Sequence, residues 1–246
     1  MIADNESSIQ EECENLFQEL VLDRLSRVGS SSLPRDGSKT LDLKRQFELL
    51  FPGVLDLLKE ISHAEVMPWV KKVCANLGKK KRLKPSIAVS LQKIIGTSES
   101  LWLSQSLPPE KWTAPPGAWF LLSEVSAYLV KEVDWEFLHH HWKILDDHGR
   151  AEFGSPVAQV GLFEDENNSE SNTIAWAQDR VFLLQTISNV SLELPPEPAE
   201  KLAHELIKKV EEFSMHSTEV SIKRIVFRLC FTVYNCWFIS PMLLIR

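Results

Sequence analysis

The sequence predicts an all-α protein, a HEAT- or armadillo-like α-solenoid built from antiparallel helix pairs. Apolar residues recur at helical spacing through the first 220 residues, and Pro or Gly interrupts the apolar stripes. Two segments also resemble each other, because FLLSEVS at residues 120–126 reappears as FLLQTIS at residues 182–188. These segments lie 62 residues apart, and without the 25-residue insertion described below the spacing is 37, near the period of about 40 in HEAT arrays.

The first predicted helix begins at Ser8, which forms a capping box with Glu11. Its apolar residues share one helical face over about five turns: Ile9, Cys13, Leu16, Phe17 and Leu20. A Gly- and Ser-rich break follows at residues 29–39, and Thr40 is placed to cap a second helix. The Phe-Pro-Gly tripeptide at residues 51–53 then interrupts that helix.

The next two helices share one pattern of start and stop signals. Pro68 suits the first turn of one helix, and Gly78 is placed to end it. Pro85 and Gly96 repeat the same arrangement around a second apolar stripe. Both segments are therefore predicted to be short amphipathic helices.

The second half of the chain predicts two helical hairpins. Residues 118–130 and 135–147 are separated by a short connection, which makes antiparallel neighbours of them, and Asp134 caps the second helix. Residues 174–190 pair in the same way with residues 198–214, across a Pro-rich turn.

Two segments depart from the helical pattern. Residues 148–172 are acidic and contain Gly and Ser, which predicts a disordered insertion. The tail contains 17 consecutive uncharged residues at 229–245, for which a membrane span, a buried helix and a sequence foreign to the native reading frame stay open, the last being preferred. The predicted organisation is a helical solenoid part at 1–147, an acidic linker at 148–172, a further hairpin of the solenoid at 173–220 and an atypical apolar tail at 221–246.

The charge distribution contains one local positive field. The formal net charge is −7, yet residues 71–84 hold seven basic side chains and no acid. Within this run the candidate site is formed by Lys79, Lys80, Lys81, Arg82 and Lys84. Such a cluster is typical of a solvated loop, of a sequence-independent contact with DNA phosphates, or of a nuclear import signal.

The sequence carries no pattern of an enzyme or of a metal site. It contains no P-loop, no GxGxxG and no GxSxG, and its four cysteines form no CxxC pair. Three adjacent histidines at residues 139–141 point about 100° apart on a helix, so they do not converge on one ion by themselves. We therefore expect no catalytic residue, no metal, no cofactor and no small-molecule substrate.

The segment PPGAWFLLSEVS at residues 115–126, together with Trp142, resembles the non-SMC HEAT-repeat D subunit of condensin II. The segments DRVFLLQTISNV at residues 179–190 and EFSMHSTEV at residues 212–220 are similar to the plant version of that subunit. The resemblance covers roughly residues 110–220 and departs from the family pattern at Ser221. Because family members are several times longer, it implies a fragment from the middle of a solenoid.

The resemblance implies a non-enzymatic scaffold in the nucleus and on chromosomes, where the kleisin and SMC subunits of condensin II would be its partners and DNA a further contact. Its role would be to support mitotic chromosome condensation. Two alternatives stay open from the residues: an armadillo-like peptide-binding adaptor or transport factor, and a helical protein anchored in a membrane by residues 229–245. A membrane partner is not expected.

Overall fold

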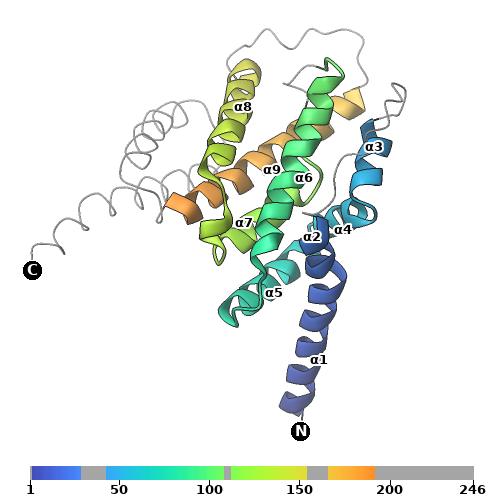
Figure 1. Cartoon of the computed structure of the whole chain (residues 1–246), viewed down its shortest axis with the longest axis vertical. Coiled ribbons are helices and arrows are strands. Elements are labelled where there is room, and N and C mark those ends of the chain that lie inside the picture. The colour runs from blue at the N-terminus through green and yellow to red at the C-terminus, as the bar shows by residue number, and fades with distance from the viewer. Residues whose placement is uncertain (1, 29–42, 108–111, 154–165, 192–246) are drawn as a thin grey trace, which may run out of the picture. The chain divides into compact units, whose positions relative to one another are not determined.

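The computed structural model describes residues 2–28, 43–107, 112–153 and 166–191, and the chain divides into two compact units, Met1–Glu132 and Val133–Arg246. Every regular element among these residues is helical and none is a strand, so the all-α prediction is confirmed (Figure 1). This all-helical architecture is consistent with a HEAT-like α-solenoid. Four predicted features lie outside the described residues: the break at 29–39, the Thr40 cap, the helix at 198–214 and the tail at 221–246.

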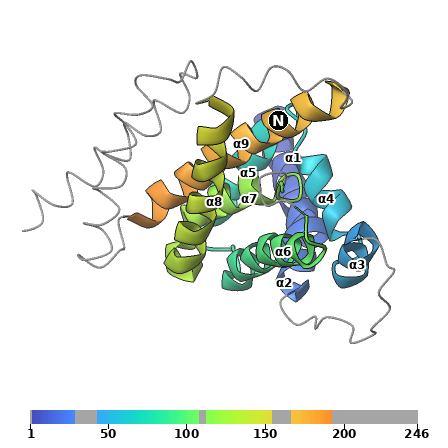
Figure 2. The ribbon, with the colours of Figure 1, turned by 90° about the horizontal axis from the view of Figure 1, so that it is seen from above.

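The N-terminal helical segment is longer than predicted. Helix α1 (Ile2–Phe17), the π-helical turn η1 (Gln18–Leu22) and α2 (Asp23–Val28) follow one another without a break. Ser8 therefore lies inside a helix and does not cap it, since no Pro or Gly between residues 2 and 8 stops the helix from extending. Both views place α2 beside α6, against which it packs (Figures 1 and 2).

The predicted apolar face of α1 is only partly buried. Phe17 is buried and meets Trp69 edge to face, with 5.3 Å between the ring centroids. Ile9, Leu16 and Leu20 stay exposed, at 62%, 50% and 46% of their surface. The helical segment is thus held mainly through its C-terminal half, where Val21, Leu22, Leu25 and Val28 are buried.

The Phe-Pro-Gly interruption is confirmed. Helix α3 (Leu43–Leu50) ends just before it and α4 (Val54–Ile61) begins just after it. Gly53 lies between them with φ of 70°, in the left-handed region that glycine enters without steric cost.

Helices α5 (Met67–Lys79) and α6 (Pro85–Ser104) begin as predicted, because Pro68 and Pro85 lie in their first turns. Neither ends at the predicted glycine. Helix α5 continues through Gly78, where the missing side chain makes room for the Tyr128 ring, with which an added Cβ would overlap. Helix α6 continues through Gly96 because its buried positions extend to Leu101.

Helix α7 (Ala118–Ser126) is the centre of the first unit, since all nine of its residues are buried. It packs against both α5 and α6. Its buried hydroxyls are satisfied within the helix: Ser123 Oγ donates to the Phe120 carbonyl at 2.7 Å and Ser126 Oγ to the Ser123 carbonyl at 2.9 Å. The helix is shorter than the predicted 118–130, and a 3₁₀ turn, η3 (Val130–Glu132), follows it.

The second unit contains α8 (Trp135–Phe153) and α9 (Glu166–Val190), which pack against each other. The predicted cap is confirmed, because Asp134 Oδ1 accepts a hydrogen bond from the Glu136 N–H at 3.0 Å. Both helices extend into the segment predicted as disordered, whose remaining residues 154–165 lie outside the described residues. Among the described residues of α8 and α9, the buried apolar side chains are Leu138, Trp142, Leu183, Leu184, Ile187 and Val190.

The two repeated segments bury equivalent positions. Leu121, Leu122 and Val125 in α7 have no exposed surface, and the matching Leu183, Leu184 and Ile187 in α9 have none either. The similarity between FLLSEVS and FLLQTIS therefore reflects the same apolar stripe in two helices.

The histidines of α8 interact within their own helix. The His139 ring stacks on Trp135, with centroids 5.7 Å apart, and His141 Nδ1 lies 2.8 Å from the Phe137 carbonyl oxygen.

None of the described helices is at once long and apolar enough to cross a bilayer, and residues 229–245 are not among the described residues.

We expect Gly117→Ala to lower the free energy of unfolding by about 2–5 kcal/mol in urea denaturation. Gly117 has φ of 78°, which L-residues adopt at a cost, and an added Cβ would overlap the backbone carbonyl of Leu58. Gly53→Ala is the control, since φ is 70° there but no atom lies within 4 Å of the added Cβ. The control should cost only about 1–2 kcal/mol; equal losses in both variants would contradict the predicted overlap.

Candidate nucleic-acid interface

The basic loop, defined here as residues 79–84, connects α5 to α6 and has a fixed backbone. Lys81 adopts φ of 55°, the left-handed conformation that usually falls to Gly after a helix. Its N–H donates to the Gly78 carbonyl at 3.0 Å, and the Arg82 N–H donates to the Leu77 carbonyl at 2.9 Å. This pair of hydrogen bonds is a Schellman motif. Leu83 is buried, so the loop is also held by apolar packing.

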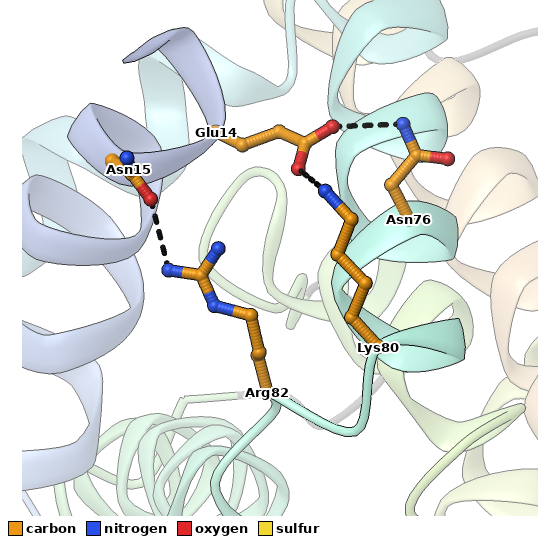
Figure 3. A network of polar contacts seen from close by, with 5 residues as sticks. All are labelled: Glu14, Asn15, Asn76, Lys80 and Arg82. Carbon is orange, nitrogen blue, oxygen red and sulfur yellow. Dashed lines mark hydrogen bonds and ion pairs between the residues drawn. The ribbon is translucent and has the colours of Figure 1, made fainter. Parts of the chain in front are cut away.

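Glu14 of α1 ties this loop to the N-terminal helix (Figure 3). The Lys80 ammonium lies 2.8 Å from Glu14 Oε2, and the Asn76 amide donates to Oε1 at 2.9 Å. The Glu14 side chain keeps 2% of its surface exposed, against 51% for Lys80. Because both carboxylate oxygens have donors, the charge is buried without being left unsatisfied.

Two further side chains of the loop contact the same helical segment. Arg82 Nη2 donates to Asn15 Oδ1 at 2.9 Å, next to the Glu14 pair (Figure 3). Lys84 Nζ lies 2.8 Å from Asp23 Oδ1 at the start of α2. Both contacts are exposed to solvent, so each contributes less than the buried Glu14 pair.

The structure thus divides the five predicted site residues into two sets. Lys80, Arg82 and Lys84 are engaged by α1 and α2. Lys79 and Lys81 are exposed, and within the described part of the chain neither forms an ion pair. Lys71, which lies on α5 outside the basic loop, is 3.7 Å from the Glu124 carboxylate. Of the five predicted site residues, Lys79 and Lys81 are therefore the most available to an outside phosphate.

The residues that bind the loop were not predicted from the sequence. Glu14, Asn15 and Asp23 lie 61 to 67 residues before their partners, and helical periodicity says nothing about such a distance. One local signal existed: Glu14 precedes Phe17 by three residues, so the two share the inward side of α1. A carboxylate on an inward position requires a cationic partner.

A titratable side chain in the core of the first unit, the Cys74 thiol, has a strongly shifted pKa. Burial, followed by the negative charge of Glu124 as the smaller cause, raises the pKa of the Cys74 thiol from 9.0 to about 12. The thiol stays protonated at physiological pH and behaves as a small apolar group of the core, as its apolar face predicted.

Lys80→Ala should lower the free energy of unfolding by about 1–3 kcal/mol, because the buried Glu14 carboxylate loses one of its donors. Lys79→Ala removes the same charge from a neighbouring exposed residue without a partner in the described residues, so a change of about 0.5 kcal/mol or less is expected there. Urea denaturation of both variants measures the difference. Equal stability of the two would show that the Glu14 pair does not hold α1.

Comparison with known proteins bears directly on the predicted family resemblance. Over 228 residues the chain is 58% identical to the Arabidopsis thaliana protein described as condensin-2 complex subunit CAP-D3. The match covers 89% of this chain and 17% of the relative, so the chain spans about a sixth of that protein's length. No family model matches the chain. No solved structure matches it either.

The predicted resemblance is thereby confirmed, and it reaches well beyond residues 110–220. An identity of 58% over most of the chain shows that this sequence is related to a segment of a condensin-2 D subunit.

Proposed function

We propose that this chain, as a relative of the condensin-2 D subunit, is a non-enzymatic helical scaffold segment of a condensin-type complex. It supports mitotic chromosome condensation in the nucleus by contacting the kleisin subunit, the SMC subunits and DNA. The observation that carries the proposal is the 58% identity over 89% of the chain to a protein named as a subunit of that complex.

The helical architecture supports a scaffold role. In a solenoid each helix pair buries one face on its neighbours and leaves its edges and loops to partners. Here α7 is buried completely, whereas the α5–α6 loop presents charged side chains to solvent. The first unit thus combines a rigid core with an exposed polar loop.

DNA binding is assigned to the exposed cations of the basic loop. Lys79 and Lys81 project from a backbone that its Schellman motif holds in one conformation. Ammonium groups at such positions contact phosphates without reading bases, and the affinity then falls steeply with salt. The same residues fit a nuclear import signal, and the second experiment below distinguishes the two roles.

The scaffold role predicts assembly with the condensin-2 core. A tagged form of the full chain, mixed with purified SMC and kleisin subunits of the Arabidopsis complex, should elute with them in size-exclusion chromatography. Excess full-length CAP-D3 should displace it, because the two would occupy the same position. Elution of the chain alone, in a preparation that binds full-length CAP-D3, would contradict the proposal.

The DNA role predicts a charge effect confined to the loop. The double variant Lys79→Ala/Lys81→Ala should bind duplex DNA more weakly and lower the slope of log affinity against log salt by about two units. The double variant Lys59→Ala/Lys131→Ala is the control, since it removes two exposed lysines elsewhere in the unit. Equal binding by both variants would contradict the DNA role. If nuclear accumulation alone were lost in the first variant, the loop would be an import signal.

A further inference from the structure

The N-terminal helix holds two cations of the basic loop that lie beside Lys79 and Lys81, to which the proposed function assigns the DNA contact. Glu14 and Asn15, adjacent in α1, hold Lys80 and Arg82 (Figure 3). The α5–α6 loop therefore exists in the folded chain with three of its five cations already engaged, two of them by α1 and Lys84 by α2. Lys80 and Arg82 contact an outside phosphate only after they leave α1.

Releasing Lys80 has a structural consequence for α1. The Glu14 carboxylate is almost fully buried, with 2% of its side chain exposed, and Lys80 supplies one of its donors. A carboxylate that loses its donor in such a place is unstable unless water reaches it. Water reaches Glu14 when α1 moves away from α5, so departure of Lys80 and release of α1 favour each other.

Among the side chains of α1 that the structure describes, Phe17 is the one buried apolar residue. Ile9 and Leu16 of α1 are exposed, and on its buried side the Phe17 ring packs edge to face with Trp69. The following segment is different, since η1 and α2 bury Val21, Leu22, Leu25 and Val28. A movement of α1 can therefore end at η1 and leave α2 in place, with its Asp23–Lys84 pair intact.

We propose that α1 is an intramolecular mask of the basic loop: Glu14 and Asn15 hold Lys80 and Arg82 until duplex DNA takes these cations, and α1 is released as the DNA binds. This inference rests on the proposed DNA contact of the loop. Carboxylate and phosphate oxygens compete for the same ammonium and guanidinium donors, so each excludes the other. The mask sets a threshold, because only a densely charged polyanion replaces the Glu14 pair.

The test compares two variants of the full chain that change α1 by the same charge. Glu14→Gln weakens the hold on Lys80, whereas Glu12→Gln neutralises an exposed acid two residues away. Glu14→Gln should bind a 30-base-pair duplex about five times more tightly than Glu12→Gln at low salt, with a salt slope steeper by about one unit. Circular dichroism verifies that both variants are folded. If Glu14→Gln does not fold, Asn15→Ala, which frees Arg82 from an exposed partner, replaces it with the same expected direction.

A second measurement follows α1 directly in the unmodified chain. Hydrogen exchange should become faster at residues 9–17 when DNA is added, and should stay slow at residues 23–28. Equal affinities of the two variants, with unchanged exchange in α1 while DNA is bound, would overturn the mask and leave the DNA contact standing. Binding by Glu14→Gln but not by the parent would support the mask. Absence of binding by the parent and by every variant would overturn the DNA contact and the mask together.

Discussion

The complete burial of α7 is the constraint on which the first unit depends. Trp119, Leu121, Leu122 and Val125 have no exposed surface, so apolar neighbours must surround this helix. Helices α5 and α6 supply two of these neighbours. Gly117 permits the chain to enter α7 close to the carbonyl of Leu58, and Gly78 permits Tyr128 to lie directly on α5. Both glycines are thus required by close packing around one buried element.

The position of the basic loop follows from that packing. Since α5 and α6 both contact α7, the connection between them must turn sharply, and Lys81 enters the left-handed region to achieve this. The turn then brings Lys80 and Arg82 to α1. The buried carboxylate of Glu14 therefore pairs with the same short segment that carries the exposed ammonium groups of Lys79 and Lys81. The cation that pairs with Glu14 is thus adjacent in the chain to the two lysines proposed to contact DNA.

The relation to a condensin-2 subunit is consistent with this combination of a buried apolar core and an exposed charged loop. The chain spans 17% of the length of its condensin-2 relative, and each of its two units has buried apolar residues of its own. The core residues are apolar and repeat from α7 to α9, as Leu121 and Leu183 illustrate.

The sequence alone determined the helical class, the interruption at Gly53, the starts of α5 and α6 at their prolines and the cap at Asp134. These features depend on the conformational limits of single residues and on periodicity, which act over a few positions. Tertiary structure decided that Gly78 continues a helix, because the space it leaves is filled by Tyr128 from a later segment. It also decided which cations of the loop are occupied, since Glu14, Asn15 and Asp23 approach from more than 60 residues away and only the folded packing of α1 and α2 brings them there.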